Sequence, residues 1–182
     1  NPFEIDVIDN ELITSTSSAL ERSYLKEMEK LQLNQMPKPL KIVYSPLHGT
    51  GGPIIPELLR QHDYDVYPYA PQMIVDPSFS NTKSSNPEEQ EAYEETLKYA
   101  KAIDADLIMV TDPDADRLGI AVKHQGEFHL LSGNQTASLE LYYILTEKKR
   151  RDTLPKKGFV YTTNVTTDLI KVMAEDFQMH VE

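Results

Sequence analysis

The sequence contains no cysteine among its 182 residues, which excludes a disulfide framework and a thiolate metal site. This absence fits a reducing compartment, and we expect a cytoplasmic protein. No apolar run approaches the roughly 20 residues of a membrane-spanning helix, and no signal peptide is expected. Basic residues are scarce, with 18 against 29 acidic residues and a net charge of −11. That balance argues against a nucleic-acid backbone or an anionic membrane as the main partner.

The chain also lacks an initial methionine, internal repeats and low-complexity tracts. Its length suits one domain of ordinary size, or one domain with part of another. Because the first residue is Asn1, we expect a piece cut from a longer protein.

Among the residues that are present, the hexapeptide 112–117 (Asp-Pro-Asp-Ala-Asp-Arg) carries the strongest signal. It lies between two apolar runs, 107–110 and 118–122, so it is expected at a strand end, with Pro113 stiffening the backbone. Three carboxylates at alternate positions repel one another unless a cation lies among them. Oxygen ligands without nearby His or Cys favour Mg²⁺, which often also takes phosphate oxygens. The predicted metal ligands are Asp112, Asp114 and Asp116.

Arg117 adds a planar guanidinium beside these carboxylates and is a candidate phosphate ligand. A solvated turn is possible, because Asp and Pro are common in turns. A calcium-binding EF-hand is excluded, because its sixth position would need Gly instead of Arg117 and its twelfth a bidentate Glu instead of Lys123.

A second candidate loop, 45–52 (Ser-Pro-Leu-His-Gly-Thr-Gly-Gly), follows a predicted strand and precedes a predicted helix. Its backbone N–H groups could bind an anion, or the loop could be only a tight strand-to-helix turn. No Lys-Ser/Thr follows the glycines, so it is not a P-loop. His48 could contact a phosphate or could have a structural role.

Strands and helices alternate along the chain. Strands are predicted at 40–44, 64–69, 106–111, 118–123 and 127–131, and helices at 19–33, 53–62, 86–103 and 133–149. Asn86, Pro87 and Glu89 have the pattern of a helix start, and Ser132 is the expected cap of the last helix. In that helix we expect four apolar residues to face the sheet: Leu139, Tyr142, Tyr143 and Leu145. A strand at 159–163 and a helix at 166–178 would begin another unit.

This order predicts the α/β class, with a mixed, mainly parallel sheet, helices on both faces and an antiparallel edge. Ligands of such sheets bind beyond the carboxyl ends of the strands. Both the loop at 45–52 and the loop at 112–117 follow strands, so we expect them to share one site.

Several motifs, in this order, resemble those of the α-D-phosphohexomutase superfamily, the phosphoglucomutases and phosphomannomutases. The resemblance is to the branch with bacterial phosphoglucomutases and phosphopentomutases. The stretches that carry it are 45–51 (Ser-Pro-Leu-His-Gly-Thr-Gly), 86–89 (Asn-Pro-Glu-Glu), 111–117 (Thr-Asp-Pro-Asp-Ala-Asp-Arg), 132–135 (Ser-Gly-Asn-Gln) and 165–169 (Val-Thr-Thr-Asp-Leu).

The resemblance implies the second domain of a four-domain enzyme, with residues 1–36 as the tail of the first domain and a lead-in helix. Residues 37–151 would form the metal-binding second domain, and 152–182 a linker with the opening strand and helix of the third. In the family the three aspartates hold Mg²⁺, and a phosphoserine from a Thr-Ala-Ser-His-Asn-Pro-type motif completes the site. This sequence contains no such motif.

The activity implied is transfer of a phosphoryl group between the 1- and 6- (or 5-) positions of a sugar phosphate, through the phosphoserine and a bisphosphate intermediate. The piece alone is expected to be inactive, with no catalytic nucleophile of its own. Two alternatives stay open at this point: a haloacid-dehalogenase-type phosphatase with Asp112 as nucleophile, although Asp116 stands where that motif has Thr or Val, and a non-catalytic metal-binding module.

Overall fold

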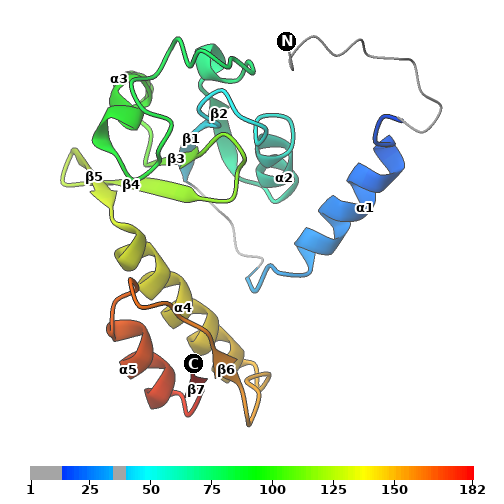
Figure 1. The fold of residues 1–182 in the computed structure, drawn as a ribbon, viewed down its shortest axis with the longest axis vertical. Coiled ribbons are helices and arrows are strands. Elements are labelled where there is room, and N and C mark those ends of the chain that lie inside the picture. Colours follow the sequence, from blue (N-terminus) through cyan, green and yellow to red (C-terminus); the bar gives the residue numbers. More distant parts are fainter. Residues whose placement is uncertain (1–13, 35–39) are drawn as a thin grey trace, which may run out of the picture. The chain divides into compact units, whose positions relative to one another are not determined.

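A computed structural model describes residues 14–34 and 40–182 (Figure 1). The chain divides into two compact units, Asn1–Asn34 and Gln35–Glu182. In the first unit, helix α1 (Ser18–Glu29) confirms the predicted helix and ends four residues earlier than expected. The side chain of Ser17 caps α1 by accepting a hydrogen bond from the Leu20 N–H at 3.3 Å. The predicted domain boundary at 36–37 lies outside the described residues.

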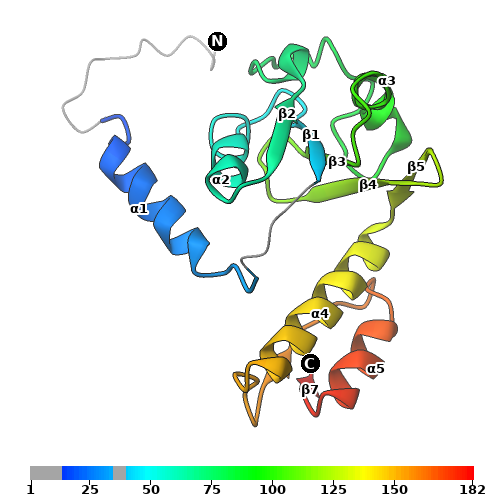
Figure 2. The same cartoon turned by 180° about the vertical axis from the view of Figure 1, so that it is seen from behind.

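The second unit contains a five-stranded sheet in the order β2-β1-β3-β4-β5 (Figures 1 and 2). Its strands are β1 (Lys41–Ser45), β2 (Asp65–Pro68), β3 (Leu107–Thr111), β4 (Leu118–His124) and β5 (Glu127–Leu131). Strand β1 is parallel to β2 and β3, whereas β4 is antiparallel to β3 and β5. The α/β class, the mixed sheet and the antiparallel edge are therefore confirmed. The prediction of a mainly parallel sheet is wrong, because two strand pairings are parallel and two are antiparallel. The difference arises at the 112–117 loop, which joins β3 to β4 as a hairpin.

Helices cover both faces of this sheet, as predicted. On one face, Val43, Ile108 and Val110 pack with residues of helix α3 (Glu94–Ala102) in the main hydrophobic cluster. On the other face, Ile42, Tyr44 and Val66 pack with residues of helix α2 (Ile55–Gln61). Alternate residues of β1 thus enter different cores, as the two-residue period of a strand requires. Strands β1 and β3, whose carboxyl ends lead into the two candidate loops, are therefore packed against hydrophobic clusters on both faces of the sheet.

The helix predicted to begin at Asn86 begins later. A 3₁₀ turn, η2 (Gln90–Tyr93), leads into α3 at Glu94, and another short 3₁₀ turn, η1 (Ala70–Gln72), lies in the long loop before it. The Asn86 side chain accepts from the Glu88 N–H at 3.1 Å, and the backbone of Glu89 is extended (φ −96°, ψ 137°). Asn86 therefore forms a local turn, the competing use of an Asn side chain.

Helix α4 (Gly133–Arg150) begins with the predicted Ser132 cap, in a capping box with Gln135. Its buried side differs from our expectation. Leu145 packs with Ala174 of α5 (Leu169–Asp176) and with Met179. The other three predicted sheet-facing residues are exposed, Leu139 by 60%, Tyr142 by 55% and Tyr143 by 44%.

The two short strands β6 (Phe159–Val160) and β7 (His180–Val181) pair in parallel next to this helix pair. Only the first two residues of the predicted strand 159–163 form a strand, and α5 is shorter than the predicted 166–178. Among the described residues, no helix combines the length and apolar character needed to cross a bilayer.

Candidate metal centre

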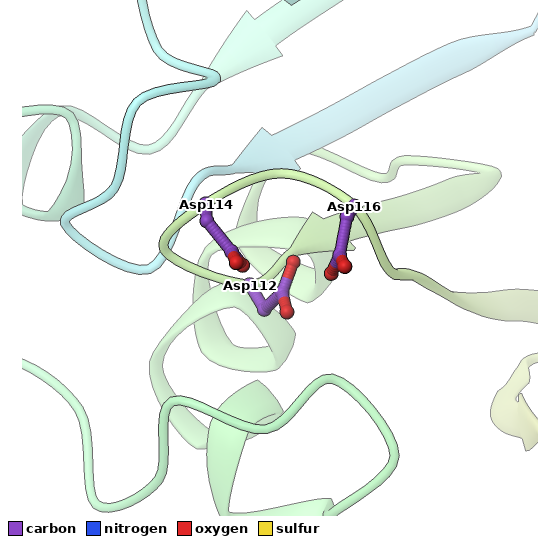
Figure 3. Close-up of side chains that lie close together, drawn as sticks. All are labelled: Asp112, Asp114 and Asp116. Atoms are coloured by element: carbon purple, nitrogen blue, oxygen red, sulfur yellow. The ribbon is translucent and has the colours of Figure 1, made fainter.

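The 112–117 loop connects β3 to β4 at the end of a strand whose last residues, Val110 and Thr111, are buried. The loop closes through a 3.0 Å hydrogen bond from the Ala115 N–H to the Asp112 carbonyl. Ala115 has a positive φ of 62°, a conformation that costs a residue with a Cβ some energy. This tight reversal brings alternate side chains to the same side of the turn, and Figure 3 shows the three aspartates pointing toward one another.

The carboxylates of Asp112, Asp114 and Asp116 each offer one oxygen atom, and these atoms lie within 4.8 Å of one another. Oxygen ligands of an octahedral Mg²⁺ at about 2.0–2.1 Å from the ion lie about 3–4 Å apart. The observed cluster needs only a small contraction to reach that spacing, and its donors are all hard oxygens. The donor set therefore fits Mg²⁺.

Asp112 is the buried member of the cluster, with 1% of its surface exposed. Its two oxygens accept from Arg117, Oδ1 from the backbone N–H at 3.0 Å and Oδ2 from Nε at 2.7 Å. Burial raises the pKa of the Asp112 carboxyl, but the hydrogen bonds and charge of Arg117 outweigh burial, and its pKa is lowered overall. Arg117 thus keeps a carboxylate ionised inside the protein.

Asp116 is exposed and has the opposite shift. The negative charge of Asp114 is the main cause that raises the pKa of the Asp116 carboxyl, followed by burial and the charge of Asp112. This shift expresses the mutual repulsion of the three carboxylates, since a nearby like charge disfavours ionisation. A divalent cation would relieve the repulsion.

The 45–52 loop lies directly against the 112–117 loop, whereas a site shared by the two loops stays a prediction. Thr50 donates to the Pro113 carbonyl through its N–H at 2.8 Å and its hydroxyl at 3.1 Å. A Cβ added at Gly49 would lie 2.2 Å from the Pro113 Cα. The loop holds the backbone of its neighbour, and glycine at position 49 makes that approach possible.

Three backbone amides of the 45–52 loop, those of residues 48–50, donate to carbonyl groups within the protein. The N–H of His48 donates to the Gln72 carbonyl, that of Gly49 to the Pro46 carbonyl, and that of Thr50 to the Pro113 carbonyl. These contacts favour the tight-turn interpretation over the anion-binding one.

His48 is 3% exposed and bonded through both ring nitrogens. Nδ1 lies 2.8 Å from the Ile74 carbonyl, and Nε2 accepts from the Asn81 N–H at 3.3 Å. With Nε2 as acceptor, the proton is on Nδ1 and is donated to the carbonyl. The geometry favours the structural role for His48.

Asn86 is a site residue that sequence reasoning missed. Its Oδ1 accepts from Arg117 Nη1 at 3.4 Å. The available signal was the Asn-Pro-Glu-Glu motif, which sequence analysis interpreted as a helix start. The two residues are separated by 31 positions, and no local pattern connects them.

Fold and site together define a mixed α/β domain with a carboxylate cluster at the β3–β4 turn that could hold a metal ion. The family model described as "Phosphoglucomutase/phosphomannomutase, alpha/beta/alpha domain II" matches residues 22–126. The chain belongs to the phosphoglucomutase/phosphomannomutase family.

Named relatives agree with this assignment. A phosphoglucomutase from Staphylococcus haemolyticus is 33% identical over 189 residues, covering 100% of this chain and 34% of the relative. A phosphomannomutase from Mycoplasmoides pirum is 33% identical over 178 residues, covering 95% of this chain and 32% of the relative. The chain therefore spans about a third of the length of these curated relatives.

Solved structures show the same fold at lower identity. A phosphoglucomutase/phosphomannomutase family protein from Burkholderia thailandensis has a TM-score of 0.67 at 18% identity, covering 89% of this chain and 32% of that chain. A putative phosphomannomutase from Thermus thermophilus has a TM-score of 0.62 at 18% identity, covering 89% and 35%. None of these comparisons supports the haloacid-dehalogenase alternative.

Proposed function

We propose that this chain supplies the Mg²⁺-binding loop of a phosphosugar mutase. The parent protein would move a phosphoryl group between the 1- and 6- (or 5-) positions of a sugar phosphate, through a phosphoserine and a bisphosphate intermediate. The observation that carries the proposal is the convergence of three carboxylate oxygens within 4.8 Å at the β3–β4 turn. Family membership supplies the reaction class, because the relatives are named phosphoglucomutase and phosphomannomutase.

In this proposal Asp112, Asp114 and Asp116 hold the ion. Bound Mg²⁺ would neutralise charge on phosphoryl oxygens and orient them. Asp112 is the immobile ligand of the three, because its side chain is buried and Arg117 already orients both of its carboxylate oxygens. The two exposed aspartates can close on the ion with little rearrangement of the fold.

Arg117 has a second proposed role toward phosphate. Its side chain is 55% exposed while paired with Asp112. A guanidinium has five N–H donors, and the contacts to Asp112 and Asn86 use two of them. The remaining donors can bind an oxygen of a phosphoserine or of a sugar phosphate beside the metal.

We infer that the 182 residues alone do not catalyse the reaction, because they include no Ser-His-Asn-Pro-type stretch for the phosphoserine. A sugar phosphate would then be bound together with other parts of the parent, which we place in the cytoplasm. A non-catalytic metal-binding module is the alternative for the piece by itself. Mutase turnover by the purified chain would contradict the inactivity that we infer.

The test is Mg²⁺ binding to the purified chain, measured by calorimetry and by the amide spectrum of the 112–117 loop. Asp114→Asn should weaken Mg²⁺ binding by more than about tenfold. Loss of a residue that only hydrogen-bonds to a metal ligand already costs about tenfold in affinity, and loss of a charged ligand itself should cost more. Asp63→Asn is the matched control, because Asp63 lies in the turn that precedes β2, at the strand end opposite the one that leads into the 112–117 loop. Equal Mg²⁺ affinity in wild type and Asp114→Asn would disprove the metal assignment.

A further inference from the structure

The segment 84–89 forms a connected polar network that ends at Arg117. Ser84 Oγ donates to Glu89 Oε2 at 2.6 Å and accepts from the Asn86 N–H at 3.0 Å. Asn86 Nδ2 donates to Glu89 Oε1 at 3.3 Å. Because Oδ1 also accepts from the Glu88 N–H, the Asn86 side chain is fixed from both of its polar ends. Its oxygen is thereby presented to Arg117 in one orientation.

The same segment is fastened to the sheet beside the metal loop. Pro87 is fully buried, and its carbonyl accepts from the hydroxyl of the buried Tyr93 at 2.9 Å. A Cβ added at Gly119 of β4 would lie 2.3 Å from that carbonyl and 2.1 Å from the Tyr93 hydroxyl. The segment therefore lies directly on β4, two residues beyond Arg117.

We propose that Asn86 is a positioning residue that holds the Arg117 guanidinium against Asp112, and thereby fixes the buried carboxylate of the metal loop. The relevance of this contact to metal binding rests on the proposed function, whereas the contact itself does not. The Asn-Pro-Glu-Glu motif then has a role at the site instead of starting a helix.

The chain of contacts explains why Arg117 needs a second support. Its Nε donates to Asp112 Oδ2, but its side chain is 55% exposed and water competes for the remaining donors. An arginine with one anchor can rotate about its last bonds and leave that geometry. A second acceptor at Nη1, 3.4 Å away on Asn86, fixes the plane of the guanidinium, and a fixed plane keeps Nε aimed at Asp112.

The first measurement is solvent exchange of the Arg117 Nε–H, observed by NMR in the 182-residue chain and assigned by its loss in Arg117→Lys. Asn86→Ser keeps a hydroxyl able to form the local turn but is too short to reach Arg117. Exchange should become about fivefold faster in this variant, the size of one ordinary hydrogen bond. Asn81→Ser is the matched control, because Asn81 Nδ2 also makes a 3.4 Å bond, to the Pro71 carbonyl, and should leave exchange unchanged.

The double variant Asn86→Asp/Glu89→Gln tests the same proposal by changing both side chains while keeping the contact to Arg117. It exchanges the carboxylate and the amide, so every hydrogen bond between positions 84, 86 and 89 can form again with an oxygen still facing Arg117. Exchange at Arg117 should remain slow. Unchanged exchange in Asn86→Ser, or fast exchange in the folded double variant, would overturn the proposal.

The second measurement is the Mg²⁺ dissociation constant of the same variants. Asn86→Ser should bind Mg²⁺ about threefold to tenfold more weakly. This loss should not exceed the roughly tenfold cost of removing a residue that hydrogen-bonds directly to a metal ligand, because Asn86 acts through Arg117. The double variant should bind as wild type does. If wild type binds no Mg²⁺, the proposed function fails, while Arg117 exchange still decides the role of Asn86.

Discussion

The pKa values of two aspartates in this protein depend on the N–H groups that hydrogen-bond to their carboxylates. Asp112 is buried and receives two bonds from Arg117. Asp76 is only partly buried, and its Oδ1 and Oδ2 accept from the backbone N–H groups of Ser78 and Ser80, each at 2.9 Å. Local donors lower the pKa of the carboxyl group in both cases, at the fully buried Asp112 and at the partly buried Asp76.

Asp76 gives a prediction about pH. Hydrogen bonds from Ser80, and then from Ser78, lower the pKa of the Asp76 carboxyl from 3.8 to about 2. A depressed pKa in the folded state stabilises it above pH 3.8, and this contribution disappears as the pH falls through about 2. Asp76→Asn should therefore lower the urea midpoint at neutral pH, and the difference from wild type should vanish by about pH 2.

Urea unfolding followed between neutral pH and about pH 2 measures this difference. Asp152→Asn, at an exposed aspartate in another turn, corrects for the loss of one negative charge. A difference between wild type and Asp76→Asn that stays constant across this range would contradict the proposed hydrogen bonding of Asp76.

For single residues, the sequence predicts those contacts that a short stretch of chain determines. The convergence of Asp112, Asp114 and Asp116 follows from one turn, and the structure brings the three together as expected. The contact between Asn86 and Arg117 depends on how two distant segments pack on β4, which no local spacing encodes. His48 shows the same limit, because its partners at Ile74 and Asn81 belong to a loop without periodicity.

Periodicity and capping residues predicted the helices and strands of the chain, but they did not always predict which side of a helix is buried. All five strands of the main sheet were predicted to within about two residues, because apolar runs bounded by turn residues are local signals. Helix α4 has apolar residues around much of its surface, so its sequence alone does not specify the side that packs. The structure buries Leu145 against α5 and leaves Leu139 exposed.

Two leucines on α4 test this packing with the same substitution. Leu145 is 4% exposed and Leu139 is 60% exposed. Leu145→Ala should destabilise the α4–α5 cluster by about 2–5 kcal/mol through lost burial and a cavity, whereas Leu139→Ala should cost less than about 0.5 kcal/mol. Hydrogen exchange of the α5 amides measures the effect locally. Equal destabilisation by the two substitutions would mean that α4 packs on a different side.

For the whole molecule, charge is the property with the widest consequences. The net charge is −11, and three of the acidic side chains gather at one turn. Added salt of any kind should therefore stabilise the fold somewhat by screening repulsion. A specific metal site must be distinguished from this general effect.

We predict that Mg²⁺ stabilises the chain more than NaCl does at the same ionic strength. A ligand that binds only the folded state, present at about 100 times its dissociation constant, adds about 2.7 kcal/mol to the free energy of unfolding. Thermal unfolding in MgCl₂ and in NaCl of matched ionic strength should therefore give a higher midpoint with Mg²⁺, and EDTA should remove the difference. Asp116→Asn should abolish the Mg²⁺-specific part while keeping the response to NaCl, because only the former needs three convergent carboxylates. If both salts act equally on wild type, the cluster is an acidic turn that merely responds to screening.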